Sequence, residues 1–147
     1  MAIYDANYLN SQRRFDLEIN GLEFICTEIT VDNTYVLVSV CYRPPTNSGD
    51  KRRAFLKNFQ VAIDKIKSYD SNIQVILGDV NDRCVSWYDI HASSELRLNV
   101  FDISTVNNLS QLINEPTRYS DNTASLLDLI FANDDKFVTE SGVNPHC

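Results

Sequence analysis

The stretch that decides the fold is VILGDVNDR, residues 75–83, in which an apolar run leads directly into Asp79 and Asn81. A short aliphatic run of this kind is typical of a buried strand. Gly78 allows the backbone to turn or a ligand to approach closely. Because layered α/β folds place ligands at the carboxyl ends of central strands, Asp79 and Asn81 are candidate site residues.

Two interpretations of this acid and this amide stay open on the residues alone. In extended geometry Asp79 and Asn81 point the same way, so a carboxylate that orients a water would lie beside an amide that holds a phosphate oxygen. Alternatively, the strand runs into an Asx-turn in which Asp79 caps its own backbone.

Composition sets the limits of the class of protein. The chain has 147 residues, of which 44% are hydrophobic, so we expect one globular domain over residues 1–147 rather than a disordered chain. No apolar run reaches the roughly 20 residues of a membrane span and no signal sequence opens the chain, so we expect a soluble intracellular protein of the nucleus or cytoplasm. The net charge of −7 argues against tight nonspecific nucleic-acid binding by this chain alone. It does not argue against an enzyme that meets phosphates through a bound cation.

The cysteines indicate neither a disulfide framework nor a zinc site. Cys26, Cys41, Cys84 and Cys147 are far apart, and no C-x-x-C pair is present. Cys26 and Cys41 fall in strand-like segments, where we expect them to be small core residues.

Strands dominate the first part of the chain. The alternating segments 15–19 and 22–31 flank Asn20-Gly21, which predicts a hairpin. A turn at residues 32–34 leads to a buried strand over 35–42, rich in β-branched and aromatic residues.

Helices then alternate with strands. Ser48 or Asp50 caps a predicted helix that ends near residues 68–69, with an apolar face at spacings of three and four. Residues 72–77 predict a central strand, a second helix is expected from about residue 94 to residue 106, and segments 109–113 and 125–132 predict further strands. The predicted apolar face of the first helix consists of Phe55, Phe59, Ala62, Ile63 and Ile66, and that of the second of Leu96, Val100, Ile103 and Val106. This order predicts an α+β fold, in the form of an α/β layered sandwich.

Two further segments carry candidate site residues. CYRPP, residues 41–45, ends a strand with Tyr42 and Arg43, which can both donate to a phosphate, although Tyr42 can also simply pack and Arg43 can be a solvated cation. Asp128 stands between two leucines of a strand. It either faces water on an edge strand, or faces a cleft and needs a partner such as a histidine.

These motifs together resemble a known family. ILGDVND, residues 76–82, is similar to the Gly-Asp-Phe-Asn motif of the endonuclease/exonuclease/phosphatase superfamily, with Val80 in place of the usual aromatic residue. CYRPP, followed later by NEPTR (residues 114–118) and SLLDLIFAN (125–133), resembles the endonuclease domain of non-LTR (LINE-type) retrotransposon polyproteins. The likeness extends over nearly the whole chain, and implies an endonuclease/exonuclease/phosphatase-like β-sandwich flanked by helices.

The resemblance implies Mg²⁺-dependent phosphodiester hydrolysis, with Mn²⁺ as an alternative ion, that nicks DNA within a longer polyprotein carrying a reverse transcriptase. Asp79 would activate the attacking water, Asn81 would hold the phosphate and Tyr42 would contact the scissile phosphate. Asp128 would orient a catalytic histidine. The resemblance implies weaker phosphate or DNA contacts for Arg43, Thr117 and Ser125.

Two family motifs have no counterpart in this sequence: a strand with the metal-binding Glu and a strand with an Asp-His pair. The resemblance is therefore to a partial domain, incomplete at both ends, whose main metal ligands are unknown. His146 lacks a preceding Asp and His91 falls in a loop, so neither histidine matches the family pattern. We expect the chain alone to be a weak or inactive nuclease. A noncatalytic remnant or interaction module, and a phosphatase of the same superfamily, are the alternatives.

Overall fold

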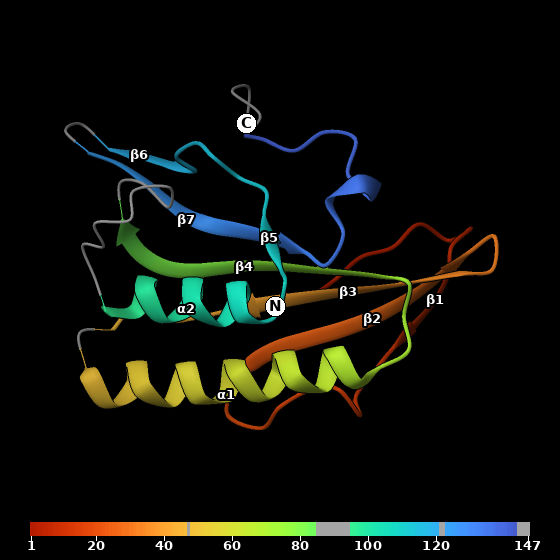
Figure 1. The fold of residues 1–147 in the computed structure, drawn as a ribbon, viewed down its shortest axis with the longest axis horizontal. Helices are drawn as coiled ribbons and strands as arrows, with labels where there is room; N and C mark the ends of the chain where they lie inside the picture. The colour runs from red at the N-terminus through yellow and green to blue at the C-terminus, as the bar shows by residue number, and fades with distance from the viewer. Residues whose placement is uncertain (47, 85–94, 121–122, 144–147) are drawn as a thin grey trace.

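The computed structural model describes residues 1–46, 48–84, 95–120 and 123–143. Seven strands form a sheet in the order β1-β2-β3-β4-β7-β5, with β6 paired to the first part of β7. Helices α1 and α2 lie on one face of the sheet (Figure 1). The strands are β1 (Asn10–Arg13), β2 (Glu23–Val31), β3 (Thr34–Tyr42), β4 (Ile73–Cys84), β5 (Ser110–Gln111), β6 (Arg118–Ser120) and β7 (Thr123–Ala132), and the helices are α1 (Gly49–Ser68), α2 (Glu95–Val106) and the short 3-10 turn η1 (Asp135–Phe137). The layered α/β architecture predicted from the sequence is confirmed.

A tight turn sets the register of β2 against β3. Asp32 and Asn33 have φ angles of 47° and 62°, the left-handed values that a two-residue hairpin turn requires. The antiparallel pairing then runs from Val31 opposite Thr34 to Glu23 opposite Tyr42. The last pair carries two polar side chains to the far end of the hairpin.

Strand β4 is central, as its apolar run predicts. It pairs in parallel with β3, in antiparallel fashion with β7, and lies between them in the sheet. Because α1 connects β3 to β4, the carboxyl ends of these two strands lie at the same edge of the sheet. The segment after Leu77 therefore reaches that edge beside the end of β3.

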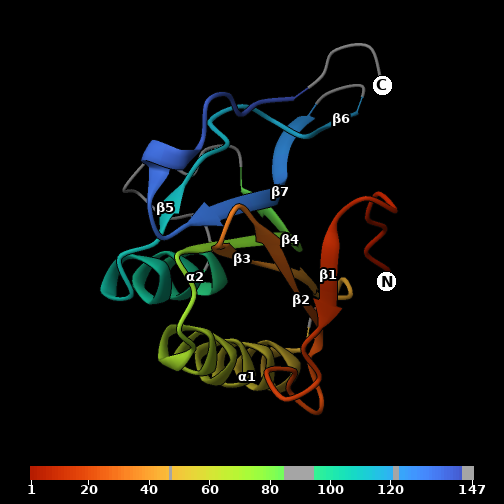
Figure 2. The same ribbon diagram turned by 90° about the vertical axis from the view of Figure 1, so that its right-hand side faces the viewer.

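The hydrophobic core lies between the sheet and the two helices (Figure 2). Helix α1 begins after Ser48, whose hydroxyl accepts a hydrogen bond from the backbone N–H of Lys51. All five residues of the predicted apolar face of α1 are buried. They pack with sheet residues that include Phe24, Leu37, Ile76 and Phe131.

Two predictions of local structure are wrong. Residues 15–19 form no strand, and Phe15 is 69% exposed; the segment instead makes successive turns, and Lys65 of α1 donates hydrogen bonds to the carbonyls of Asp16 and Glu18. On the side of β2 away from β3, the strand that pairs with it is β1 and not residues 15–19. In α2, Val106 is 78% exposed because the helix ends there, while Val100 is fully buried. The side chain of Leu96 lies outside the described part. Within the described residues, no helix is long and apolar enough to cross a membrane.

Candidate active site

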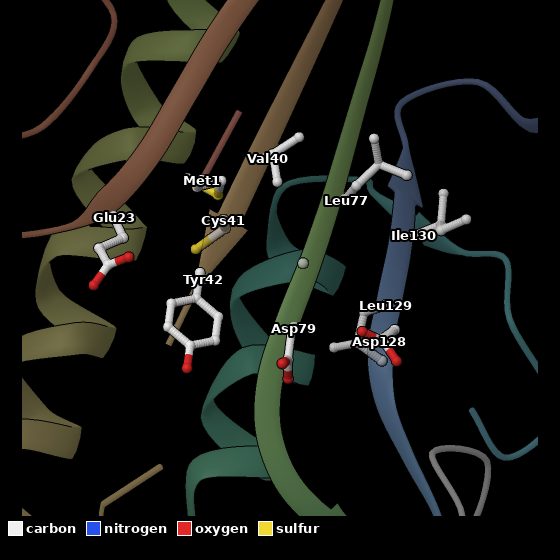
Figure 3. A pocket seen from close by; sticks show the side chains of 11 residues that line it. Met1, Glu23, Val40, Cys41, Tyr42, Leu77, Asp79, Asp128, Leu129 and Ile130 are labelled. Atoms are coloured by element: carbon white, nitrogen blue, oxygen red, sulfur yellow. The ribbon is translucent and has the colours of Figure 1, made fainter. Parts of the chain in front are cut away.

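Four polar side chains form one row across neighbouring strands. Glu23 of β2 is paired with Tyr42 of β3. Tyr42 is in turn paired with Asp79 of β4, and Asp79 is paired with Asp128 of β7. Directly paired residues project on the same side of a sheet, so the four side chains share the face opposite the helices. Figure 3 shows Tyr42, Asp79 and Asp128 directed toward the same space. The sequence predicts that separate strands bring Tyr42, Asp79 with Asn81, and Asp128 to one place. The structure brings Tyr42, Asp79 and Asp128 together, but Asn81 is not among the residues that line their groove.

The row borders an open groove with an aliphatic floor. The next register row on the same face consists of Ile25, Val40, Leu77 and Ile130, all half-buried. The groove, about 600 Å³ in volume, is lined by the polar row together with Val40, Leu77 and Ile130 (Figure 3). A substrate in this groove would rest on apolar side chains and meet its polar contacts at the strand ends.

Asp79 and Asn81 are joined by a tight turn rather than by extended backbone. The backbone N–H of Asn81 donates to Oδ1 of Asp79 over 3.0 Å, and Asn81 has a φ of 49°. This is the Asx-turn that the sequence left open as an alternative. The expectation that both side chains point the same way assumed extended geometry, which this φ excludes. The Asn81 side-chain amide donates to the backbone carbonyl of Arg43 over 2.8 Å.

Arg43 lies beneath the strand ends and not at the surface. It is 4% exposed, and its guanidinium donates from Nε to the Val80 carbonyl over 2.5 Å and from Nη2 to the Asn81 carbonyl over 2.7 Å. A solvated cation, one of the two interpretations left open by the sequence, is therefore wrong. The other interpretation, a phosphate contact, would have to involve a side chain already bonded to the backbone of β4.

The backbone of Asp128 is held in place by hydrogen bonds to Thr117. The Thr117 hydroxyl accepts hydrogen bonds from the backbone N–H groups of Leu127 and Asp128, at 3.0 and 3.1 Å. Ser125 accepts, through its carbonyl, a bond from the backbone N–H of Thr117. Asp128 is exposed in the groove, and β7 lies between β4 and β5 and is not an edge strand. Thr117 thus bonds to the strand that carries Asp128, and Ser125 belongs to that strand. His91 and His146 lie outside the described residues.

Comparisons with known proteins agree with this geometry. Residues 36–146 match the model of the family described as endonuclease-reverse transcriptase. The chain belongs to this family. The matched range includes the segments CYRPP, LGDVN and LLDLI, which supply Tyr42, Asp79 with Asn81, and Asp128. No curated protein matches the chain.

Solved structures that resemble this endonuclease-reverse transcriptase family member share the endonuclease/exonuclease/phosphatase fold. The endonuclease domain of TRAS1, a telomere-specific non-LTR retrotransposon, superposes with a TM-score of 0.65 and 16% identity, over 87% of this chain and 55% of that one. Beta toxin from Staphylococcus aureus with bound magnesium ions gives 0.51 and 16%, over 76% and 42%. TDP2 from D. rerio with a single-stranded DNA product gives 0.51 and 14%, over 84% and 52%. The chain thus spans about half of these structures.

Burial and charge perturb Asp79. Partial burial raises the pKa of the Asp79 carboxyl, the backbone N–H of Asn81 lowers it, and the nearby charge of Asp128 raises it. The described residues that line the groove include three acids and no lysine, arginine or histidine. An anionic phosphate would be repelled by this surface unless a cation were also bound.

The row supplies two carboxylates that could bind Mg²⁺, which is fewer than a complete ligand set. Mg²⁺ favours carboxylate oxygens and is often held by one or two carboxylates together with substrate phosphates and water. Asp79 and Asp128 are two such carboxylates on adjacent strands. Among the described residues, no three His, Cys, Asp or Glu side chains group closely enough to hold a metal ion by themselves. The described part of the chain therefore offers an open, two-carboxylate site and not a closed cage.

Glu23 is a groove residue that the sequence interpretation missed. It lies on the same row as Tyr42 and Asp79 because the register of the β2–β3 hairpin is fixed by the turn at Asp32-Asn33. Counting pairs outward from that two-residue turn places Glu23 opposite Tyr42. The signal was thus present in the sequence, in the position of the turn.

Proposed function

We propose that this family member is a metal-dependent phosphodiesterase that nicks DNA, and that it acts as the endonuclease part of a retrotransposon-type protein that also carries a reverse transcriptase. The observation that carries the proposal is the register row that puts Tyr42, Asp79 and Asp128 side by side at the ends of three adjacent strands. The family description and the retrotransposon endonuclease among similar structures support the same assignment.

Three side chains of the row, together with Asn81, have chemical tasks in this proposal. The Tyr42 hydroxyl donates a hydrogen bond to a phosphate oxygen. The ionised Asp79 carboxylate orients the attacking water and takes up its proton. The Asn81 amide nitrogen has two hydrogens, so it keeps one donor for the phosphate after bonding to Arg43. Asp128 accepts a hydrogen bond from the catalytic histidine that the family resemblance implies, and so fixes its tautomer.

Asp79 and Asp128 are the residues of the described chain that would hold Mg²⁺ or Mn²⁺. The bound ion would neutralise charge on the phosphate and on the leaving oxygen. The magnesium ions bound in the similar beta toxin structure support a divalent ion here. With a net charge of −7, we expect DNA affinity of this chain to be weak and to fall with salt.

A plasmid-nicking assay tests the proposal. Supercoiled plasmid is incubated with excess protein in Mg²⁺ or Mn²⁺ at low salt, because a single nick converts each plasmid to the open circle. Because we expect the chain alone to be a weak nuclease, we expect slow nicking that EDTA abolishes and that Asp79→Asn reduces by about 100-fold or more, the usual loss on removal of a general base. The matched control Asp70→Asn, an exposed acid before the start of β4, keeps the wild-type rate. Nicking that survives Asp79→Asn, or its absence in wild type with both ions, would overturn the proposal for this chain.

A further inference from the structure

Arg43 makes an unusual set of contacts for a residue that directly follows a site residue. It comes after Tyr42 at the end of β3, yet its side chain is 4% exposed. Burial of a guanidinium is costly unless its N–H groups are bonded. The side chain lies over the ring of Phe55 on α1, with the guanidinium carbon 5.9 Å from the ring centroid. Its hydrogen bonds reach the carbonyls of Val80 and Asn81.

Four hydrogen bonds join this one residue to the end of β4. Two come from the guanidinium, one runs from the Arg43 backbone N–H to the Asp79 carbonyl at 2.9 Å, and one runs from the Asn81 amide to the Arg43 carbonyl. They begin where the regular pairing of β3 with β4 ends, at Tyr42 opposite Asp79. Arg43 thus continues the connection between the two strands after the ladder has stopped.

The segment that Arg43 holds is the one that leaves strand geometry. Asn81 adopts a φ of 49°, and the regular pairing of β4 with β7 shifts after Asp79. This turn points consecutive carbonyls, those of Val80 and Asn81, away from the neighbouring strands, so each needs a donor from elsewhere. The planar fork of an arginine can serve two such carbonyls at once, and the single ammonium of a lysine cannot match that geometry.

We infer that Arg43 is a positioning residue: its buried guanidinium locks the Asp79–Asn81 turn and thereby fixes the orientation of the Asp79 carboxylate in the groove and that of the Asn81 amide beside it. This inference rests on the proposed function for its consequence in catalysis, but the locking itself is a property of the folded chain. A purely structural arginine, held only by packing on Phe55, would stabilise the whole domain without a specific effect on the turn.

Nuclear magnetic resonance on the full chain separates these two cases. Arg43→Met removes the fork, Arg43→Lys keeps the charge without the fork, and Arg53→Met is the control. Arg53 is an exposed residue of α1, where its guanidinium pairs with Asp50. The readout is hydrogen exchange at the Asn81 amide, compared with the Leu77 amide in the regular part of β4.

In Arg43→Met we expect exchange at Asn81 to speed up by about tenfold or more relative to Leu77, because the bond to Asp79 Oδ1 loses its support. The exchange rate of the Asn81 amide in Arg43→Lys should resemble that in Arg43→Met, and the rate in Arg53→Met should resemble that in wild type. Equal changes at Asn81 and Leu77 in both Arg43 variants would overturn the inference.

Two additions keep the test decisive. If Arg43→Met does not fold, Arg43→Lys decides by the same ratio of exchange rates. In the Asn81→Gly background the turn needs no side-chain support, because glycine adopts positive φ freely. In that background Arg43→Lys should therefore change the exchange rate at residue 81, relative to that at Leu77, much less.

If the nicking assay is positive, Arg43→Lys should lower kcat more than it raises KM. A wild type that nicks no DNA would count against the proposed function, and the exchange data would still decide the role of Arg43.

Discussion

Asp79 of β4 and Asp128 of β7 are direct register partners, so two carboxylates stand opposite each other in one groove. Like charges in directly paired positions of a sheet repel each other. Partial burial and the charge of Asp128 both raise the pKa of Asp79, and this repulsion is the cost of gathering acids where a cation and a phosphate are to bind. We therefore expect the two carboxylates to lower the folding stability of the protein when no cation is bound between them.

The first prediction concerns the pH dependence of stability. Because the pKa of Asp79 is raised in the folded state, its contribution to stability is fully present below the unfolded-state pKa, about 4, and is lost as pH rises through the folded-state pKa. Asp79→Asn keeps the acceptor for the Asn81 N–H but has no charge. We expect the melting temperature of Asp79→Asn minus that of wild type to grow as pH increases from about 3 to 7.

Asp128→Asn provides the matched comparison for that experiment. Removal of the partner charge lowers the pKa of Asp79, so the loss of stability with rising pH should shrink without disappearing, since burial remains the larger cause. A difference in melting temperature between Asp79→Asn and wild type that stays constant with pH would contradict the prediction.

The second prediction concerns Thr117. Its hydroxyl oxygen accepts two backbone N–H groups of β7, one of them from Asp128. Thr117→Val keeps the shape of the side chain but leaves both donors without this acceptor, so we expect a loss of about 1–2 kcal/mol in the free energy of unfolding, measured in urea. Thr117→Ser restores the oxygen and should recover most of the loss. No loss in Thr117→Val, or a loss in Thr117→Ser as large as that in Thr117→Val, would contradict this role of the hydroxyl.

The third prediction concerns the two buried thiols. Burial raises the pKa of Cys26 to about 11 and that of Cys41 to about 12. Since the thiolate is the reactive form, neither should react with a thiol reagent at pH 7 in the native state. The variant with Cys84→Ser and Cys147→Ser isolates these two thiols, which should be modified only as fast as the protein unfolds. Rapid labelling of either in native conditions would show that the core at β2 and β3 opens locally.

The sequence was most informative where the pattern is local. The period-2 and apolar runs of β3 and β4, the helical spacing from Phe55 to Ile66 and the turn at residues 32–34 all describe contacts between near neighbours. The common location of Tyr42 and Asp79 could also be predicted, because parallel strands joined by one helix bring their carboxyl ends to the same edge. Asp128 was identified from the family resemblance, because periodicity alone does not show which strand pairs with the strand of Asp128.

What could not be predicted depends on distant partners. The hairpin predicted at Asn20-Gly21 does not form with residues 15–19. Lys65 of α1 instead binds the carbonyls of Asp16 and Glu18. The backbone N–H of Arg14 donates to the carbonyl of Cys26. The position of Arg43 depends on carbonyls 37 and 38 residues further along the chain. No pattern around Arg43 itself indicates that its side chain turns inward.

The last prediction concerns Gly78, which the sequence assigned to a turn or to the close approach of a ligand. The structure gives it a different constraint: a Cβ at this position would lie 3.2 Å from the carbonyl oxygen of Cys41 in the paired strand β3. Both backbones belong to the central ladder and cannot easily move apart. We therefore expect Gly78→Ala to lower the free energy of unfolding by about 1–3 kcal/mol, the usual cost of overpacking, as measured in urea. Gly49→Ala is the control, because its Cβ would meet only the flexible side chain of Arg53, at 3.8 Å, in the first turn of α1. That substitution should leave stability unchanged or raise it by up to about 1 kcal/mol. If the two alanine variants were equally stable, the close contact between β3 and β4 beneath the Tyr42–Asp79 pair would not be the reason for glycine at position 78.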